Sequence, residues 1–293
     1  MAAKIIDGVR LAGEMREACR ERVARLARAH DLVPGLAVIV IGEDPASAIY
    51  VRNKIRACAQ VGIRSFRYDY PTDVATATIL DRIAALNASP QVHGILVQLP
   101  LPPQLAADPI LRSISVDKDV DGFHLYNVGA LVLGNTVFPP CTPHGVLKLL
   151  EREGIPLEGQ NVVVVGASNI VGKPMALMLM QRDATVVICH AKTRDLAQFT
   201  ILADVLVVAA GQPNLIVPQM VKTGAVVIDV GINRLPDGRL VGDVDFEGVR
   251  RKASHITPVP GGVGPMTVTM LLVNTIASAE RMAERIAGRP GPG

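Results

Sequence analysis

Tyr50 and Lys54 are the first side chains along the chain whose types and spacing can do chemistry. Because they are four residues apart on a predicted helix, they lie on the same side of it, at the border of its apolar face. A lysine held there loses part of its hydration, which lowers its pKa toward neutrality and suits it to proton transfer. The spacing alone favours a simpler reading, a lysine that extends its charge into water beside a half-buried tyrosine. The predicted apolar face consists of Ala48, Val51, Ile55, Cys58 and Ala59.

Gln98 ends a predicted buried strand and precedes Leu-Pro-Leu-Pro-Pro, which cannot continue a sheet. Open α/β folds bind ligands at the carboxyl ends of their parallel strands, so Gln98 is a candidate site residue. A glutamine that only hydrogen-bonds its own loop is the alternative.

An acidic cluster, Asp117-Lys-Asp-Val-Asp121-Gly, begins like an EF-hand calcium loop. The twelfth position of such a loop should be Glu, and here it is Val128, so calcium binding is not expected. Two interpretations stay open, a solvated turn or one carboxylate directed into a binding cleft.

A glycine loop, Gly166-Ala-Ser-Asn-Ile-Val-Gly172, joins an all-valine strand to a helix, which is where a dinucleotide pyrophosphate binds. The N-terminus of a helix offers N–H groups and a partial positive charge to phosphate. A P-loop is excluded because five residues separate the glycines rather than four, and Pro174 follows Lys173. A purely structural turn is the alternative, since Ser168 replaces the second glycine of the usual dinucleotide motif.

The end of the next strand, Cys189-His-Ala-Lys-Thr-Arg194, bears on the choice of cofactor. NAD-binding folds usually carry Asp or Glu there to bind the ribose 2′-hydroxyl. This segment has no acid, and Lys192 and Arg194 favour the 2′-phosphate of NADP by charge. The same two cations fit the solvated start of a helix equally well.

The composition predicts a soluble globular protein of about two domains, because the chain has 293 residues, 49% of them hydrophobic and 19% charged. A net charge of +3 and 3% aromatic residues give no basic stripe with stacking rings, so no nucleic-acid partner is expected. No apolar run reaches membrane length and no secretory signal opens the chain, which predicts a cytoplasmic protein without a membrane partner. The four cysteines form no CxxC pair and the six histidines no ligand spacing, so reduced thiols and no metal site are expected.

Strands and helices alternate along the chain, which predicts an α/β fold with a mostly parallel sheet. In the first half we expect a helix over about 8–30, a strand over 36–41, a helix from an Asp44 N-cap and Pro45 to Gly62, a strand near 66–70, a helix near 76–87 and a strand over 94–98. In the second half we expect a helix through 146–151, strands over 161–165, 185–189, 204–209 and 225–230, a helix from 266 to about 286 that returns to the first domain, and a frayed tail over 288–293.

Six segments together closely resemble the bifunctional methylenetetrahydrofolate dehydrogenase/methenyltetrahydrofolate cyclohydrolase family, and they occur in family order over nearly the whole chain. The segments are Tyr50-Val-Arg-Asn-Lys54, Gly94-Ile-Leu-Val-Gln98-Leu-Pro-Leu-Pro, Lys118-Asp-Val-Asp121-Gly, Pro140-Cys-Thr-Pro143, Gly166-Ala-Ser-Asn-Ile-Val-Gly172 and Thr257-Pro-Val-Pro-Gly-Gly-Val-Gly-Pro-Met-Thr267.

The resemblance implies two α/β domains flanking a cleft, usually in a homodimer. A folate-binding catalytic domain would cover 1–139 with the C-terminal helix at about 267–293, and a Rossmann-like NADP-binding domain would cover 140–266. The implied activity is oxidation of 5,10-methylenetetrahydrofolate with NADP, then hydrolysis of the 5,10-methenyl product to 10-formyltetrahydrofolate at the same folate site. Both steps belong to the one-carbon metabolism that serves purine biosynthesis.

The resemblance assigns catalytic roles to Lys54, Tyr50, Gln98 and Asp121. A neutral Lys54 would assist proton removal as water adds to the methenyl carbon, and Gln98 would hold Lys54 and lower its pKa. Tyr50 would shape the site over the folate ring, and Asp121 would accept hydrogen bonds from the pterin edge. The implied folate site also includes Val97, Leu99, Pro260, Gly261, Gly262, Val263 and Gly264. The implied cofactor site comprises Gly166, Ala167, Ser168, Ile170, Val171, Gly172, Ala191, Lys192, Thr193 and Ile232.

Two positions depart from the family pattern. Family members contact the 2′-phosphate through an arginine after the first glycine of the loop, or through an arginine or serine after the histidine of the second strand. This chain has Ala167 and Ala191 there, so that Lys192, Thr193 or Arg194 would have to substitute, and NAD is the alternative cofactor. The alternative functions are an unrelated NAD(P)-dependent dehydrogenase and a non-catalytic folate- or nucleotide-binding regulator.

Overall fold

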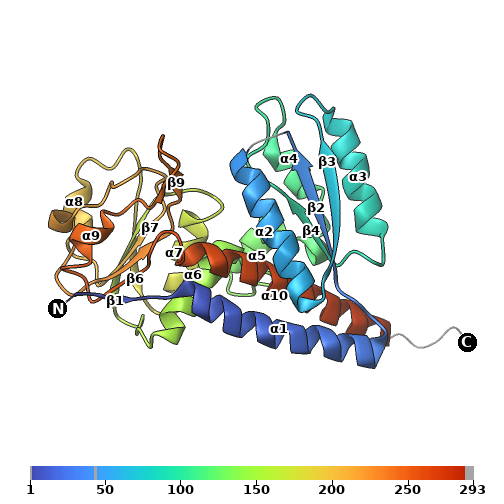
Figure 1. Ribbon diagram of the computed structural model, residues 1–293, viewed down its shortest axis with the longest axis horizontal. Coiled ribbons are helices and arrows are strands. Elements are labelled where there is room, and N and C mark those ends of the chain that lie inside the picture. The colour runs from blue at the N-terminus through green and yellow to red at the C-terminus, as the bar shows by residue number, and fades with distance from the viewer. Residues whose placement is uncertain (1, 43–44, 288–293) are drawn as a thin grey trace, which may run out of the picture. The chain divides into compact units, whose positions relative to one another are not determined.

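The computed structural model describes residues 2–42 and 45–287, which form two compact units (Figure 1). The glycine-loop unit contains the chain up to Gly13 and Pro140–Thr267, and the Tyr50 unit contains Glu14–Pro139 and the chain from Val268 onward. The sequence places residues 1–139 in one domain, whereas the first 13 residues cluster with the glycine-loop unit. The reason is that β1 (Lys4–Ile5) pairs in parallel with β11 (His255–Ile256) of that unit.

In the described part of the chain, the glycine-loop unit is built on a parallel sheet of six strands in the order β1-β11-β8-β7-β5-β6. Its longer strands are β5 (Asn161–Val165), β6 (Thr185–Cys189), β7 (Val205–Val208) and β8 (Val226–Asp229). The four predicted strands match them to within one residue, because valine-rich runs pack well in a sheet that is covered on both faces. The predicted α/β fold with a mostly parallel sheet is confirmed.

Helices and a hairpin connect these strands. They are α6 (Cys141–Arg152), α7 (Gly172–Met180), α8 (Leu196–Thr200), the 3₁₀ helix η2 (Pro218–Met220), the hairpin of β9 (Asn233–Arg234) and β10 (Leu240–Val241), and α9 (Phe246–Val249). The two-residue strands were not predicted, since so short a segment carries no periodic pattern.

The Tyr50 unit has a smaller parallel sheet in the order β3-β2-β4, formed by β2 (Gly35–Ile41), β3 (Arg64–Tyr70) and β4 (Gly94–Val97). Helices α2 (Pro45–Val61) and α3 (Thr76–Ala88) lie on opposite sides of it (Figure 1). Ile79 and Ile83 of α3 belong to the same buried core cluster as Ile39 of β2. The short helices α4 (Ala107–Arg112), η1 (Val116–Lys118) and α5 (Leu125–Val132) follow β4. The predicted Asp44 cap of α2 and the predicted tail over 288–293 lie outside the described residues.

Two long helices border the Tyr50 unit, α1 (Gly8–His30) and α10 (Val263–Ala287), and α10 begins three residues before the predicted start. Arg22 of α1 makes a bidentate ion pair with Glu280 of α10. Ser278 donates to the carbonyl of His93, next to the amino end of β4, and to the carbonyl of Asp117. These buried or half-buried contacts attach the C-terminal helix to the small sheet.

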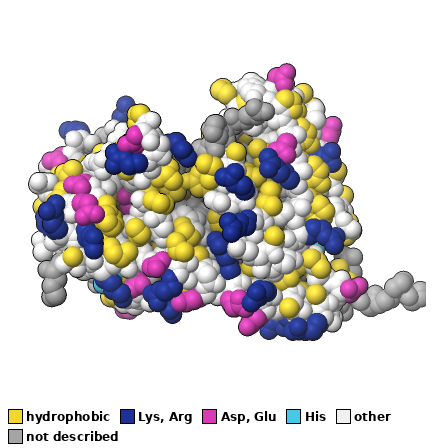
Figure 2. Space-filling view, viewed as in Figure 1, with side chains coloured by type: hydrophobic (Ala, Val, Ile, Leu, Met, Phe, Trp, Pro, Cys, Tyr) yellow, Lys and Arg dark blue, Asp and Glu magenta, His cyan; other side chains and the backbone are white. Residues whose placement is uncertain are grey.

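The surface is mixed in charge. On the face shown in Figure 2, basic side chains lie among acidic and hydrophobic ones, which agrees with the small net charge of +3. Within residues 2–42 and 45–287, no helix has both the length and the apolar character that crossing a bilayer requires.

Lys118 is a buried lysine that holds the end of α3. It is 4% exposed, and its ammonium donates to the carbonyls of Leu86, Asn87 and Ser89 at 2.9, 2.8 and 2.7 Å. The last carbonyls of a helix lack the usual partner within the helix, and here two of the three accept only long bonds, from the N–H groups of Ser89 and Val92. The ammonium therefore supplies a short hydrogen bond to each of them. We expect Lys118→Met to lower the free energy of unfolding by about 2–4 kcal/mol in urea titrations. Lys148→Met, which breaks a more exposed pair with Glu151, should cost less than about 1 kcal/mol, and equal effects would contradict the capping role.

Candidate functional site

Lys54 and Gln98 meet in the Tyr50 unit. The Lys54 ammonium nitrogen lies 3.1 Å from Gln98 Oε1, although the two residues are 44 apart in the sequence. Both side chains are half-buried. Helix α2 supplies the lysine, and the carboxyl end of β4 supplies the glutamine. The Gln98 amide nitrogen donates to the carbonyl of Leu99 at 2.7 Å, which fixes its oxygen toward the lysine. The glutamine therefore bonds its own loop and orients the amine at the same time, with buried Val97 and half-buried Leu99 on either side.

The core face of α2 differs from the predicted one. Its buried residues are Val51, Ala57, Cys58 and Val61. Ala48 and Ala59 are exposed, so their predicted burial is wrong. Because successive residues turn by 100°, the core face is centred near Lys54, and Tyr50 and Lys54 are half-buried within it. Burial also raises the pKa of the Tyr50 hydroxyl, which keeps the phenol neutral near pH 7.

The acids of the 117–121 cluster have different partners. Asp117 forms an ion pair with Arg285 at 2.6 Å. Asp119 is buried and accepts hydrogen bonds from the backbone N–H groups of Phe123 and His124 and from the side chain of Asn127. Asp121 is half-buried and directly follows Val120, which contacts β4. Asp117 and Asp119 therefore have structural roles, and Asp121 is the acid of this cluster to which the family resemblance assigns ligand binding.

The glycine loop of the other unit turns tightly between β5 and α7. Gly166 has a φ of +119°, and a Cβ on it would lie 2.1 Å from the carbonyl oxygen of Ala209. A Cβ on Gly172 would lie 1.9 Å from the carbonyl oxygen of Gly166. Ser168 closes the turn, because its hydroxyl accepts from the N–H groups of Val171 and Gly172 at 3.1 and 3.3 Å. The hydroxyl that closes the turn therefore explains why Ser168 stands where the usual dinucleotide motif has its second glycine.

The same loop fits a dinucleotide phosphate. Its residues Ser168, Asn169 and Ile170 are exposed at the carboxyl end of β5. Among the residues that the structure describes, none accepts a hydrogen bond from the backbone N–H groups of Asn169 and Ile170. Available N–H groups before the N-terminus of a helix are suitable donors to phosphate.

The predicted 2′-phosphate segment follows β6. Ala191 and Lys192 are exposed and Thr193 is half-buried. The Thr193 hydroxyl accepts from the N–H group of His190 at 2.9 Å, and the N–H group of Lys192 donates to the His190 ring at 3.2 Å. Thr193 thus shapes the turn, while Lys192 presents its charge to solvent at the same edge as the glycine loop.

The segment from Thr257 brings the two predicted ligand sites of this unit together. Pro260 is exposed, Gly261 and Gly264 are half-buried, and Gly262 and Val263 are buried. A Cβ on Gly264 would lie 3.5 Å from the side chain of Ile232, which is 41% exposed. One predicted folate residue therefore lies close to one predicted cofactor residue. Gly262 is needed by its own turn, since a Cβ there would press on Thr257 and the carbonyl of Pro258.

Sequence reasoning missed two buried acids in this unit, Asp229 at the end of β8 and Asp243 after β10. They are 3% and 0% exposed, and each accepts several hydrogen bonds from backbone N–H groups. Glycines adjoin both acids in the sequence, at Gly231 and Gly242, and a Cβ on either glycine would collide with the opposite carboxylate. The sequence signal that could have indicated these buried acids is a glycine close to an acid at the end of a strand.

Asp229 makes the stability of the fold depend on pH. Burial raises the pKa of Asp229 to about 7, and the facing charge of Asp243 contributes to the rise. Because the folded state binds this proton more tightly than the unfolded state, its contribution is full below about pH 4 and is lost as the pH rises through about 7. We expect the loss of this contribution to lower the free energy of unfolding by up to about 4 kcal/mol between about pH 4 and pH 7, as measured in urea titrations. In Asp229→Asn this decrease of the free energy of unfolding with pH should disappear. An unchanged pH dependence would show that another group causes it.

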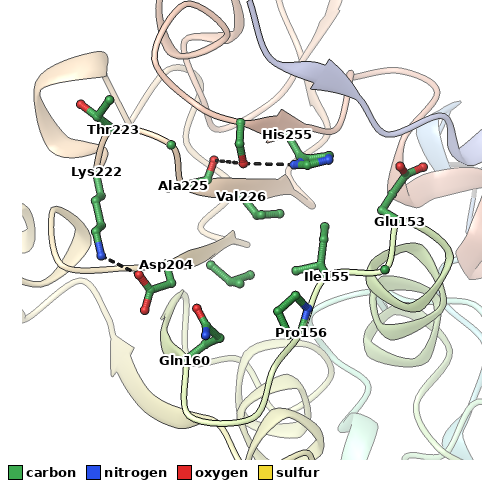
Figure 3. Close-up of a pocket in the computed structure, with 14 residues that line it drawn as sticks. Glu153, Ile155, Pro156, Gln160, Asp204, Lys222, Thr223, Ala225, Val226 and His255 are labelled. Atoms are coloured by element: carbon green, nitrogen blue, oxygen red, sulfur yellow. Dashed lines mark hydrogen bonds and ion pairs between the residues drawn. The ribbon is translucent and has the colours of Figure 1, made fainter.

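A cavity of about 420 Å³ lies at the amino ends of the large sheet, away from the glycine loop (Figure 3). Ile155, Pro156 and Val226 line it, and the Asp204–Lys222 pair at 2.6 Å closes one side. None of the predicted site residues lines this cavity, and ligands of open α/β sheets bind at the carboxyl ends instead. It is therefore not the candidate site.

The glycine-loop unit is thus a Rossmann-like dinucleotide-binding domain, and the Tyr50 unit is an α/β domain with an oriented lysine. Family models match both parts: tetrahydrofolate dehydrogenase/cyclohydrolase, catalytic domain, over residues 6–121, and the NAD(P)-binding domain of the same family over residues 140–283. The chain belongs to the tetrahydrofolate dehydrogenase/cyclohydrolase family.

Similar proteins agree with this membership. The bifunctional protein FolD of Nitrosospira multiformis is 59% identical over 288 residues, which cover 98% of this chain and 100% of that protein. The crystal structure of the FolD methylenetetrahydrofolate dehydrogenase/cyclohydrolase of Campylobacter jejuni has 51% identity and a TM-score of 0.94, covering 96% of this chain and 100% of that one. The Trypanosoma brucei enzyme, solved with NADP cofactor and inhibitor, has 40% identity and a TM-score of 0.93, covering 96% and 99%.

Proposed function

We propose that this protein oxidises 5,10-methylenetetrahydrofolate with NADP and hydrolyses the 5,10-methenyl product to 10-formyltetrahydrofolate. The observation that carries the proposal is the Lys54–Gln98 hydrogen bond at 3.1 Å, inside a chain whose two halves match the catalytic and NAD(P)-binding domains of one folate family. The match to both domains argues against an unrelated dehydrogenase, which would need only the glycine-loop unit.

Hydrolysis needs a group that takes a proton from the attacking water. The methenyl group is a resonance-stabilised cation and a charged ammonium would repel it, so the unprotonated amine of Lys54 is the acting form. Gln98 Oε1 fixes the position of that amine, and the neutral Tyr50 hydroxyl, on the same face of α2, borders the folate ring. Water then adds to the methenyl carbon as Lys54 removes one of its protons. The bond from that carbon to N5 breaks, N5 takes up a proton and the added hydroxyl loses its own, which leaves the formyl group on N10 and releases one proton overall.

Binding of the substrate is proposed to involve three segments of the chain. Asp121 is proposed to accept two hydrogen bonds from the amidine-like edge of the pterin, which suits a half-buried carboxylate. Val97, Gln98 and Leu99 of the β4 end are proposed to contact the folate. Residues 260–264, where a Cβ on Gly264 would lie 3.5 Å from Ile232, are the third proposed folate-binding segment.

The dehydrogenase step needs alignment more than acid–base chemistry. NADP, when bound, supplies a hydride acceptor. The exposed N–H groups of the glycine loop are proposed to hold its phosphates, and Ile232 is proposed to support the nicotinamide end. The 2′-phosphate would be held by exposed Lys192, with Thr193 and Ala191 shaping the turn, because Ala167 and Ala191 offer no charge.

The test is a pair of assays on the purified protein. We expect oxidation of methylenetetrahydrofolate, followed through the reduced nicotinamide, and accelerated hydrolysis of methenyltetrahydrofolate, followed through loss of its absorbance. Failure of both reactions, with NADP and with NAD, would refute the proposed function and leave the non-catalytic regulator as the better explanation.

Cofactor preference is tested on the cation at the end of β6. We expect kcat/KM to be higher with NADP than with NAD, and Lys192→Met to reduce that ratio by about fivefold to tenfold, since one exposed phosphate contact contributes roughly 1 kcal/mol. Lys173→Met is the matched control, because Lys173 is already bonded to Asn169 at 2.7 Å. An NADP/NAD ratio that Lys192→Met leaves unchanged would remove Lys192 from 2′-phosphate binding.

We propose further that the protein is a cytoplasmic homodimer. The edge strand β6 exposes Val187 and Ile188, and Ile201 and Leu202, which follow α8, are 45% and 63% exposed. An apolar edge strand is suited to pairing with a second copy. Sedimentation equilibrium should give twice the chain mass, and a monomer at micromolar concentration would contradict this part of the proposal.

A further inference from the structure

The side chain of Asp243 joins two loops at the carboxyl edge of the large sheet. Its Oδ2 accepts from the N–H groups of Ala210 and Gly211 at 2.7 and 2.9 Å, directly after β7. Its Oδ1 accepts from the side-chain amide of Asn233 at 2.8 Å, at the start of the β9–β10 hairpin. Asp243 is 0% exposed, and a carboxylate is costly to bury without hydrogen-bond donors. Because the three donors belong to two loops, the carboxylate fixes the positions of both loops relative to each other.

Asp229 continues the connection to two more segments. Its carboxylate accepts from the N–H groups of Gly231 and Asp243 at 3.0 Å each, and of Val244 at 2.9 Å. Its own N–H group donates to the Thr257 hydroxyl at 2.7 Å, at the beginning of the segment that leads to Gly264. The two acids together therefore tie the β7 loop, the β8 loop, the hairpin and the Thr257 segment.

These loops surround the position proposed for the nicotinamide. In the sheet, strand β7 lies between β5 and β8. Strand β5 ends at the glycine loop, and strand β8 ends at Asp229, directly before Val230. Ile232 is held between two anchored neighbours, since the N–H group of Gly231 bonds to Asp229 and the side chain of Asn233 bonds to Asp243. A Cβ on Gly166 would lie 2.1 Å from the Ala209 carbonyl oxygen, and the Ala209 N–H group donates to the Val165 carbonyl at 2.7 Å, so the β7 loop lies directly against the glycine loop.

We propose that Asp243, supported by Asp229, is a positioning residue for the dehydrogenase reaction: it sets the Ala210–Gly211 and Ile232 loops against the nicotinamide end of the cofactor. The inference rests on the proposed function and assigns the pair to only one of its two activities. Lys54 and Gln98, proposed for hydrolysis, belong to the other compact unit.

The test uses a swap that preserves the hydrogen bond. Asn233→Asp places a carboxylate against the carboxylate of Asp243, and Asp243→Asn places an amide against the amide of Asn233. Each single variant therefore disturbs the hydrogen bond between residues 233 and 243. The double variant lets Asn at 243 donate to Asp at 233 while its oxygen still accepts from Ala210 and Gly211. Asp237→Asn, in the same hairpin but exposed and paired with Arg239, is the matched control.

We expect each single variant to lower kcat/KM for oxidation by about tenfold to a hundredfold, mainly by raising KM for NADP, and to leave hydrolysis within twofold. The double variant should recover most of the oxidation, and Asp237→Asn should change neither activity. Parallel loss of both activities, or a double variant no better than the singles, would overturn the inference, as would singles with unchanged oxidation. A wild-type protein without oxidation refutes the proposed function instead, so the two failures are distinguishable.

Discussion

Lys54→Met should abolish the hydrolysis of methenyltetrahydrofolate while leaving part of the oxidation. Removal of a positioned proton acceptor costs a factor of about 10²–10⁴, and the methionine side chain retains the apolar stem that packs within the α2 face. Oxidation persists because it depends on alignment of substrate with cofactor, to which the lysine contributes only contact. The rates are measured from the loss of methenyl absorbance, after subtraction of spontaneous hydrolysis, and from the formation of reduced nicotinamide.

Arg56→Met is the matched control for this prediction. Arg56 lies two residues further along α2, on its exposed side, so the substitution removes a cation from the same helix but not from the core face. We expect both activities of this variant to stay within twofold of the wild type. If Lys54→Met and Arg56→Met hydrolyse equally well, Lys54 is not the proton acceptor, although the family membership stands.

The fold could be predicted from the sequence wherever an element carries its own pattern. The valine runs of β5, β7 and β8 and the amphipathic α1 are recognisable because burial repeats along them. Strands β1 and β11 could not be predicted, because their two residues each acquire strand geometry only by pairing, β1 with β11 and β11 also with β8. For the same reason the sequence gives no sign that the first 13 residues cluster with the glycine-loop unit.

The candidate site was predictable in part. Spacing showed that Tyr50 and Lys54 share a helix side, but the choice between a functional and a solvated lysine came from the family resemblance. The structure adds the contact of Lys54 with Gln98, which no local pattern encodes, and the catalytic role itself stays a prediction. Asp229 and Asp243 escaped notice because a buried acid differs from a surface acid only through its distant donors.

Gly172→Ala should selectively remove the dehydrogenase activity. The added Cβ would lie 1.9 Å from the carbonyl oxygen and 2.6 Å from the carbonyl carbon of Gly166, both backbone atoms, so the glycine loop itself must move. A displacement of about 1 Å at the phosphates costs roughly a hundredfold in rate, and we expect that loss in kcat/KM for oxidation together with weaker NADP binding by calorimetry.

Hydrolysis by the Gly172→Ala variant should stay within twofold, because Lys54 and Gln98 belong to the other compact unit. Gly13→Ala in α1 is the matched control: a Cβ there meets nothing within 4 Å, and alanine in a helix stabilises by about 0.5–1 kcal/mol relative to glycine. Near-normal oxidation in Gly172→Ala would show that the loop tolerates the shift and does not set the cofactor position. Equal loss of hydrolysis with an unchanged free energy of unfolding would show that the loop serves both reactions, since a folded variant would then have lost a shared site.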